Sequence, residues 1–366
     1  KVDTPKHGIK IGKGLGSIAD ETLRFYRQIG VEEVTMPSRF LTKASERGLV
    51  PPAQLAPQGP QPAAWREADL CHIADQIRSF GLTPSAMNLP LSGNIVMGRN
   101  GRQADIAKAQ ACIRIAARVG IKVMTYTFTA LRASEGYAAQ EGKGRGTSLL
   151  RDFDSERIRD LPPLGSVGCH NMQEMWNRLT YFLQTVIPVA EKVGIRLAVH
   201  PNDPPVSEFR GVTQPLSDLA GLQRLIEVID SPSNCLFFDT GVLTEMGEDA
   251  VKAIHYFGRR DRIAIVHFRN VRVQIPHEKY IETFVDNGDC DMLACMKALQ
   301  KVGYTGMVDP DHTPSIAKDT ADTRIGWAFA IGHIIALRNA AEEHGKELQE
   351  ATRFHPSEHW KQRGVN

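Results

Sequence analysis

The sequence predicts a single (β/α)8 barrel, an α/β fold in which eight parallel strands each lead into a helix. Strand-like and helix-like segments alternate eight times along the 366 residues, and several predicted helices end at a glycine followed directly by a strand. A chain of roughly 250 to 400 residues with eight such alternations is what this barrel requires. A doubly wound open sheet is the alternative. It lacks support because the turn Gly12-Lys13-Gly14-Leu15-Gly16 does not have the GxGxxG spacing of a nucleotide-binding fold.

The order of elements follows from short apolar runs and amphipathic stretches. Strands are predicted at 9–12, 33–37, 84–89, 122–128, 196–200, 235–239, 263–267 and 306–311. Helices are predicted at about 20–29, 65–80, 105–119, 172–193, 219–229, 248–257, 292–302 and 324–341. The glycines expected to end helices are Gly30, Gly81, Gly120, Gly194, Gly258 and Gly303.

Three stretches do not fit the alternation. Residues 51–64 are rich in Pro and Gln and are expected to form a surface loop. Residues 130–168 form the longest irregular stretch, and we expect a lid or binding loop there. The last residues, 342–366, are polar and are predicted to form a terminal helix or arm. The domain organisation is therefore one barrel over 1–341 with a long loop at about 130–168, followed by a C-terminal extension at 342–366.

Composition excludes several classes of protein. The chain has 44 basic and 42 acidic residues and a net charge of +2, which gives no reason to expect a nucleic acid partner. Its apolar runs are far shorter than the ~20 residues needed to cross a bilayer, and the first residues have no signal-peptide core. The six cysteines contain no CxxC pair. They are expected to be reduced thiols, which favours a cytoplasmic setting and makes a structural zinc cluster unlikely.

Four late strands stop at residues that can bind a divalent metal. His200, Asp239, His267 and Asp311 are predicted to end the fifth, sixth, seventh and eighth strands. The carboxyl ends of barrel strands all lie at one mouth, where active sites are found. The sequence therefore predicts a metal centre of two imidazoles and two carboxylates. This donor set suits Mn2+, Fe2+, Co2+, Zn2+ or Mg2+, and the absence of thiolate favours the harder ions.

Each of these residues also has a structural interpretation. A histidine at a strand end is often only hydrogen-bonded, and an aspartate at such a turn is often a helix cap. Four such residues at equivalent positions in consecutive units seldom arise from capping alone. This coincidence favours the metal site.

Neighbouring residues supply candidates for proton transfer and substrate binding. His312 follows Asp311, so it can face the substrate as an acid or base, or else hold a ligand from behind. Arg269 and Asn270 follow His267 and could bind a carboxylate or hydroxyl groups, or lie in a surface loop. Arg145, in a glycine-rich segment with Lys143, could close over an anionic substrate. For Lys143 a flexible, solvated position is the expected alternative.

With these residues placed, the chain resembles the metal-dependent mannonate dehydratase family, a group within the xylose-isomerase-like TIM barrels. The resemblance extends from about Pro90 to Ile331. Its most specific blocks are His200-Pro201-Asn202-Asp203-Pro204-Pro205, His267-Phe268-Arg269-Asn270-Val271, Gly288-Asp289-Cys290-Asp291-Met292 and Pro310-Asp311-His312. The resemblance implies Mn2+ or a similar ion held by His200, His267 and Asp311, with His312 as acid or base. It also implies conversion of D-mannonate to 2-keto-3-deoxy-D-gluconate, and a homodimer.

Two positions depart from the family pattern. Asp239, in Phe238-Asp239-Thr240-Gly241, stands where the family usually has a metal-binding Cys. A carboxylate still binds metal there, but it makes the site harder. Trp327, in Ile325-Gly326-Trp327, stands where the family has a catalytic Tyr. An indole cannot supply a phenolic proton. Tyr137 or a metal-bound water are candidates to replace that proton donor.

Three functions are consistent with these residues. The first is a lyase that removes water from a sugar acid, D-mannonate or a related aldonate. The second is a metal-dependent isomerase or epimerase of a sugar or sugar acid, which the site with Asp239 also suits. The third is a metal-binding protein without catalytic activity, for which Trp327 is the only indication.

Overall fold

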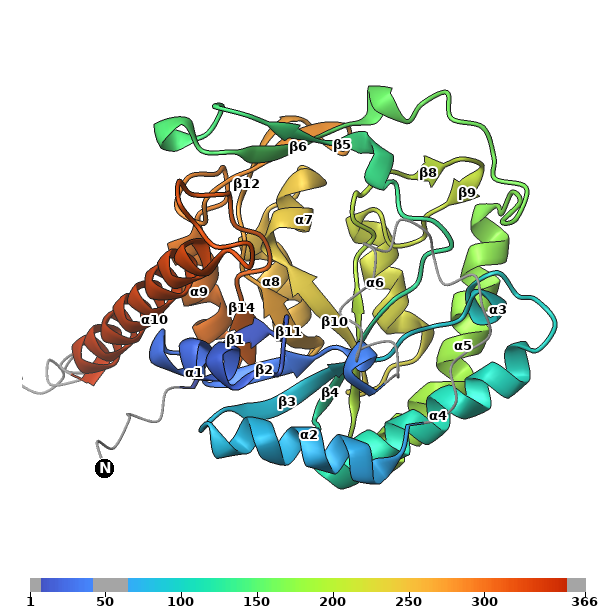
Figure 1. Cartoon of the computed structure of the whole chain (residues 1–366), viewed down its shortest axis with the longest axis horizontal. Coiled ribbons are helices and arrows are strands. Elements are labelled where there is room, and N and C mark those ends of the chain that lie inside the picture. The colour runs from blue at the N-terminus through green and yellow to red at the C-terminus, as the bar shows by residue number, and fades with distance from the viewer. Residues whose placement is uncertain (1–7, 42–64, 354–366) are drawn as a thin grey trace, which may run out of the picture.

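The computed structural model describes residues 8–41 and 65–353, and these form a closed barrel of eight parallel strands surrounded by helices (Figure 1). The strands follow in the barrel order β1-β2-β3-β4-β7-β10-β11-β14, and β14 pairs with β1 to close it. Their bounds are β1 Lys10–Gly14, β2 Glu33–Met36, β3 Thr83–Asn88, β4 Val123–Thr127, β7 Arg196–His200, β10 Asn234–Asp239, β11 Ile263–His267 and β14 Met307–Asp309. The predicted fold class is confirmed.

Helices cover the outside of the barrel. The longer ones are α1 Asp20–Gln28, α2 Glu67–Ser79, α4 Arg102–Val119, α5 Met172–Val193, α6 Leu219–Val228, α8 Ala250–Gly258, α9 Met292–Lys301 and α10 Arg324–Arg353. Two short helices, α3 Gly93–Val96 and α7 Thr240–Glu245, were not predicted. The glycines Gly120 and Gly194 end α4 and α5 with φ of 91° and 72°, a backbone conformation that glycine adopts without strain.

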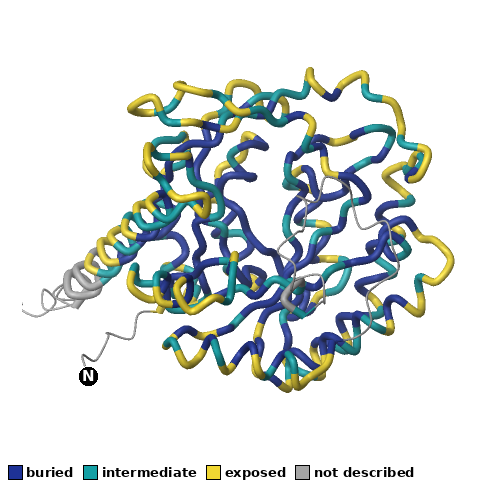
Figure 2. The backbone as a smooth tube through the Cα atoms, viewed as in Figure 1, coloured by how far each residue is buried: buried dark blue, intermediate teal, exposed yellow. Residues whose placement is uncertain are grey.

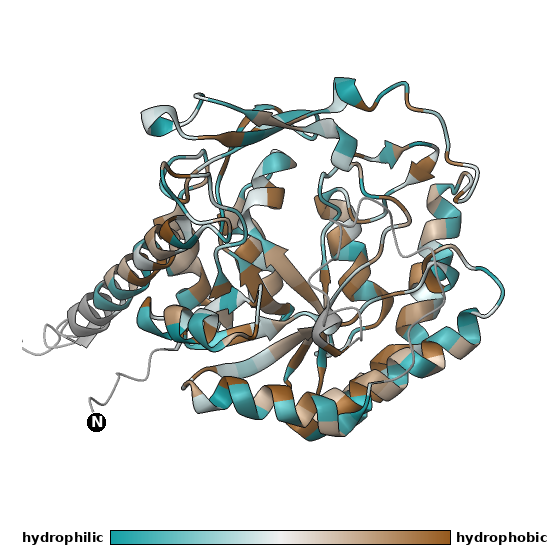
Figure 3. Ribbon diagram, viewed as in Figure 1, coloured by the Kyte–Doolittle hydropathy of each residue, from teal (hydrophilic) through white to brown (hydrophobic). Residues whose placement is uncertain are grey.

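The apolar residues form two layers of core. One small cluster fills the inside of the barrel, and it consists of Ala86, Val123, Ala198, Cys235, Phe237, Ala264, Ile265 and Met307. A larger cluster lies between the strands and the helices, and most residues of the barrel strands are accordingly buried (Figure 2). In Figure 3 the brown, hydrophobic colour is prominent in the central strands, whereas the helices alternate between brown and teal segments. Among the described residues, no helix has the length and apolar character needed to span a membrane.

The segment predicted to be irregular is folded. Residues 130–168 contain β5 Tyr137–Gln140 and β6 Leu150–Asp154, with the short 3-10 turns Ser134–Gly136, Arg145–Thr147 and Ser155–Arg157. These strands join β12 Val271–Ile275 and β13 Lys279–Glu282 in an antiparallel sheet of order β12-β13-β6-β5. We call this sheet the roof, and Figure 1 shows it above the barrel. The prediction failed because four-residue strands with distant partners leave little local signal.

Two other boundaries differ from the sequence-based expectation. Helix α10 continues to Arg353, since the residues after Ala341 are mostly good helix formers. Strand β14 ends at Asp309 instead of Asp311. Asp309 faces β1, where its carboxylate accepts hydrogen bonds from Lys13 Nζ at 3.1 Å and from the Gly14 N–H at 2.7 Å. The loop predicted at 51–64 lies outside the described residues. The remaining strands, β8 Glu208–Phe209 and β9 Val212–Thr213, form a small hairpin.

Candidate metal centre and active site

Three of the predicted ligands meet at the mouth of the barrel because strand register brings them together. His200, Asp239 and His267 are the last residues of β7, β10 and β11, and Asp239 pairs directly with His267 in the sheet. His200 Nε2 lies 3.0 Å from His267 Nδ1, and both nitrogens lie 3.3 Å from Asp239 Oδ2. Their ligand atoms all lie within 4.8 Å of one another. The three side chains form a possible metal-binding triad.

The orientation of His200 suits metal binding. Its Nδ1 lies 2.8 Å from the Pro201 carbonyl oxygen, so this nitrogen carries the proton and Nε2 presents its lone pair to the triad. Phe237 packs against both imidazoles, with ring centroids 5.3 Å from His200 and 4.0 Å from His267. One side of the triad is thus covered by an apolar ring. An imidazole and carboxylate set of this kind fits a divalent cation.

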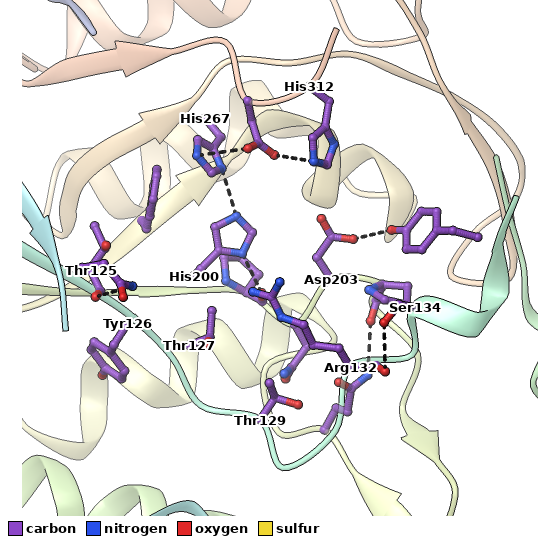
Figure 4. Close-up of a pocket in the computed structure, with 18 of the residues that line it drawn as sticks. Thr125, Tyr126, Thr127, Thr129, Arg132, Ser134, His200, Asp203, His267 and His312 are labelled. Carbon is purple, nitrogen blue, oxygen red and sulfur yellow. Dashed lines mark hydrogen bonds and ion pairs between the residues drawn. The ribbon is translucent and has the colours of Figure 1, made fainter. Parts of the chain in front are cut away.

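Asp311 lies beside the triad in the loop after β14. Its Oδ1 is 3.6 Å from His267 Nε2, and its Oδ2 is 3.2 Å from His312 Nε2 (Figure 4). It therefore approaches the opposite nitrogen of His267 from the one that faces His200. The structure brings all four predicted ligands to one place, but only three of them form the compact group.

Asp239 also serves as a helix cap, so the structural interpretation of this residue holds together with the functional one. Its Oδ1 accepts a hydrogen bond of 2.8 Å from the Val242 N–H in the first turn of α7. Its Oδ2 faces the two histidines and also accepts from Arg269 Nε at 3.0 Å. Burial disfavours the charged carboxylate, but Arg269 and the two imidazoles keep the pKa of Asp239 well below its usual range. Asp239 is therefore an anion in the triad.

Arg269 is buried behind the triad and does not reach out as an anion clamp. Its Nε, NH1 and NH2 groups bind Asp239, Glu245 and Asp203 at 3.0, 2.7 and 2.9 Å. Only 1% of its side chain is exposed. Its donors are taken up by protein carboxylates, and it fixes the position of Asp239 and Asp203.

The other two predicted substrate-binding residues have structural partners. Asn270 donates to the carbonyls of Val285 and Cys290, and its Oδ1 accepts from the N–H groups of Val271 and Cys290. It shapes the loop that precedes α9. Arg145 pairs with Asp286 at 2.6 Å, and it does not belong to the residues that line the central cavity.

His312 lines the central cavity, between the end of strand β14 and the roof. Its Nδ1 is 2.9 Å from Glu282 Oε1 of β13, and Glu282 also binds Arg151 of β6. Burial favours the neutral imidazole, but the carboxylates of Asp311 and Glu282 raise the pKa of His312 on balance. Burial alone would raise the pKa of the Glu282 carboxyl. The positive charges of His312 and Arg151 have the larger effect and lower this pKa to about 2. His312 therefore lies between two carboxylates, Asp311 in the loop after β14 and Glu282 in the roof.

The cavity above the triad has a volume of about 460 Å³, which is within the usual range for small-molecule sites. Besides His200 and His267, its lining includes several polar side chains that the sequence analysis did not select: Asn88, Thr127, Arg132, Arg151, Asp203 and Gln214. Arg132 is exposed, and no hydrogen bond or ion pair of its guanidinium is found among the described residues, although its backbone carbonyl accepts from Ser134. Arg132 follows β4 within the stretch assigned to a loop. The sequence could have identified Arg132 as a candidate because it is a polar residue shortly after the end of a predicted strand.

Trp327 lies in the first turn of α10, outside this lining. It borders an adjoining cavity of about 450 Å³, which shares Tyr137, Arg151, Asp311 and His312 with the central one. The Lys13 ammonium lies over the indole, 4.0 Å from the ring centroid. Trp327 therefore contributes an apolar wall beside His312 and no titratable group.

Comparisons with known proteins agree with this architecture. Solved structures with the same fold include the mannonate dehydratase from Streptococcus suis serotype 2, with a TM-score of 0.76 and 21% identity over 92% of this chain and 96% of that one. They also include a xylose isomerase domain protein from Alicyclobacillus acidocaldarius, with a TM-score of 0.59 and 14% identity over 91% and 99%. The chain has the same TIM-barrel fold as these structures, with a possible metal-binding triad at its mouth.

Sequence comparison narrows the class. The family model for D-mannonate dehydratase (UxuA) matches residues 169–347, a range that contains the triad, Asp311 and His312. Mannonate dehydratase 2 of Halalkalibacterium halodurans is 27% identical over 68% of this chain and 79% of its own length. The mannonate dehydratase of Oceanobacillus iheyensis is 28% identical over 72% and 81%. The resemblance expected from the sequence is confirmed, since the chain is similar to mannonate dehydratases in sequence and in fold.

Proposed function

We propose that this chain is a metal-dependent hydro-lyase that removes water from D-mannonate or a related aldonate, giving 2-keto-3-deoxy-D-gluconate or its counterpart. The observation that carries the proposal is the position of the triad and His312 around one cavity, within the segment that matches the mannonate dehydratase family. The curated relatives with this name support the same reaction.

The residues that would hold the metal are His200, Asp239, His267 and Asp311. We propose Mn2+ as the ion, with Fe2+, Co2+, Mg2+ or Zn2+ as the other ions that this donor set accepts. When bound, such an ion supplies a positive charge that polarises the substrate and acidifies the proton next to its carboxylate. Asp203, Asp239 and Asp311 are concentrated around Arg269, and their negative charge favours cation binding there.

Protein side chains would bind the substrate and move its protons. Arg132 is placed to pair with the substrate carboxylate, because it lines the cavity and is not engaged by a protein carboxylate among the described residues. The positive charge of a bound ion close by would lower the pKa of His312, so that its neutral imidazole could take the proton from C2. Glu282 and Asp311 hold the imidazole in position. Arg269 and Asn270 act by fixing Asp239 and the loop before α9. Arg145 would reach a substrate only by leaving Asp286.

The decisive experiment combines metal analysis with product detection. Protein loaded with Mn2+ should convert D-mannonate to a 2-keto-3-deoxy product, which can be followed by a thiobarbiturate assay and mass spectrometry. Metal-loaded, folded protein that leaves a panel of aldonates unchanged would contradict the proposal.

A second candidate is a sugar or sugar-acid isomerase or epimerase. The carboxylate of Asp239 in place of the family's thiolate favours it. Solved structures of similar fold include an L-ribulose 3-epimerase, with a TM-score of 0.58 and 17% identity. Exchange of a carbon-bound substrate hydrogen with solvent deuterium, without loss of water, would support this candidate over the lyase.

The assembly and location are also proposals. The resemblance supports a homodimer, which light scattering of the purified protein would test. The six free cysteines support a cytoplasmic setting.

A further inference from the structure

Tyr137 places a phenol hydroxyl at the boundary between the central cavity and the cavity beside Trp327, and it lines both. It is the first residue of β5, so it reaches the active site from the roof. Its hydroxyl donates a hydrogen bond of 2.6 Å to Asp203 Oδ1 and lies 2.8 Å from the Tyr280 hydroxyl of β13. Figure 4 shows the hydrogen bond between Asp203 and this phenol as a dashed line.

The direction of these hydrogen bonds follows from the number of protons. The ionised Asp203 can only accept, so Tyr137 uses its single proton for that bond. Tyr280 must then donate its own proton to the Tyr137 oxygen. A Tyr137 oxygen that had lost its proton would keep this hydrogen bond, which would stabilise the phenolate.

Burial and nearby carboxylates favour the protonated form of the Tyr137 phenol. Burial raises the pKa of the phenol, and the carboxylates of Asp203, Glu245 and Glu282 raise it further. The Arg151 guanidinium lies over the Tyr137 ring, 4.1 Å from its centroid. The Phe153 ring also packs against Tyr137, at a centroid distance of 5.1 Å. Tyr137 is therefore protonated at neutral pH, with a cation close enough to stabilise a transient negative charge.

The proposed dehydration needs two proton transfers, and His312 accounts for one. Loss of water also requires an acid that protonates the departing hydroxyl. Trp327, at the position where the family resemblance implies a Tyr, supplies an indole instead. Tyr137 lines the same cavity as His312 and comes from a different segment, which suits an acid acting on a neighbouring carbon.

We propose that Tyr137 is the catalytic acid that protonates the leaving hydroxyl, an inference that rests on the proposed dehydratase function. In this step His312 takes the proton from C2, and the electron pair of the broken C2–H bond forms the C2–C3 double bond. The C3–O bond breaks with its electron pair, and the oxygen takes the proton of Tyr137 and leaves as water. The enol then becomes the 2-keto product, and solvent restores both protonation states.

The test compares Tyr137→Phe with wild type on two substrates. On D-mannonate we expect kcat to fall by about 100-fold or more, as for loss of a general acid, with KM within about threefold and unchanged metal content. On 3-deoxy-3-fluoro-D-mannonate we expect a smaller loss, because fluoride leaves without needing a full proton. Released fluoride is measured with an ion-selective electrode.

Two further variants separate chemistry from structure. Tyr280→Phe removes the hydrogen bond to the Tyr137 oxygen, and we expect it to lower kcat by less than Tyr137→Phe does. Tyr256→Phe is the matched control. Tyr256 lies on α8, where its ring packs against Phe257 at a centroid distance of 5.0 Å, and it lines neither of the two cavities. We expect wild-type activity from it.

The outcomes are distinct. A decrease below tenfold in Tyr137→Phe, or equal decreases on both substrates, would overturn the inference while leaving the dehydratase function intact. Wild-type protein without dehydratase activity would refute the proposed function, and the assignment of Tyr137 with it. A larger loss in Tyr280→Phe than in Tyr137→Phe would also overturn the assignment.

Discussion

The floor and the roof of the active site are built in different ways. The floor consists of His200, Asp239 and His267, each fixed at the end of a barrel strand. The roof consists of β5 and β6 from one loop and β12 and β13 from another, more than a hundred residues later. The floor residues are thus positioned by short, buried strands. The roof instead depends on contacts between side chains of strands that are far apart in the sequence. We expect the floor to control metal binding, and the roof to control proton transfer and access.

The strongest way to test this division is to remove a floor residue. His267→Ala deletes the imidazole that faces both the rest of the triad and Asp311. We expect loss of bound metal and a decrease in activity of about 1000-fold, because a bound ion would stabilise the transition state by several kcal/mol. Metal content by mass spectrometry and turnover of D-mannonate measure the two effects.

The matched control is His72→Gln, a histidine on the exposed face of α2. It should retain the wild-type metal content and activity. A His267→Ala protein that still held one equivalent of ion and turned over normally would show that the floor is not the metal centre.

A change in the roof should act differently. Phe153→Ala removes a fully buried ring that packs against Tyr137 and Tyr280, with centroid distances of 5.1 and 5.2 Å. Truncating a buried Phe costs about 3 to 5 kcal/mol. We expect amide exchange in β5, β6 and β13 to accelerate by about 100-fold or more, while the barrel strands stay protected. Metal content should be unchanged.

Equal acceleration of exchange in the barrel strands would contradict a roof that opens on its own. In that case floor and roof would form one cooperative unit. Loss of metal in Phe153→Ala would lead to the same conclusion.

The difference between floor and roof also explains what the sequence could predict. Each floor residue follows a run of buried apolar residues, so the local pattern identifies both the strand and its end. The second role of Asp239, as cap of α7, uses its other oxygen and leaves the prediction intact. Arg269 was misjudged because three acidic partners come from separate segments, and spacing does not reveal that they surround it.

The roof left weaker signals because its contacts are distant in the sequence. Arg151 faces Glu282 and Asp154 faces Lys279 in the register of β6 and β13, across about 130 residues. Neither strand exceeds five residues. Complementary charges at matching positions are visible only once the pairing is known.

Glu282 links roof and floor, and acid should reveal this link. Its pKa is about 2 in the folded protein, below the ordinary value of 4.5, because His312 and Arg151 outweigh the effect of burial. A lowered folded-state pKa stabilises the protein above pH 4.5, and this stabilisation is lost as the pH falls toward 2. We expect the difference in free energy of unfolding between wild type and Glu282→Gln to narrow by about 2 kcal/mol between pH 7 and pH 3.

Urea unfolding at both pH values measures this difference. A constant gap between the two proteins over that range would show that Glu282 has an ordinary pKa when folded. Its contacts with Arg151 and His312 would then contribute no charge-dependent stability.

The smallest effect is expected at the edge of the roof, where Asp154 pairs with Lys279 at 2.7 Å. The Lys279 side chain is 41% exposed, so solvent and salt screen the pair, and such pairs contribute about 0.2 to 1 kcal/mol. Asp154→Asn keeps the acceptor for the Glu156 N–H and removes only the charge. A double-mutant cycle with Lys279→Gln, read by amide exchange in β6 and β13, should give a coupling below about 1 kcal/mol that vanishes in 1 M salt. A coupling of several kcal/mol would mean that charge pairing, instead of the packing of Phe153, holds the two halves of the roof together.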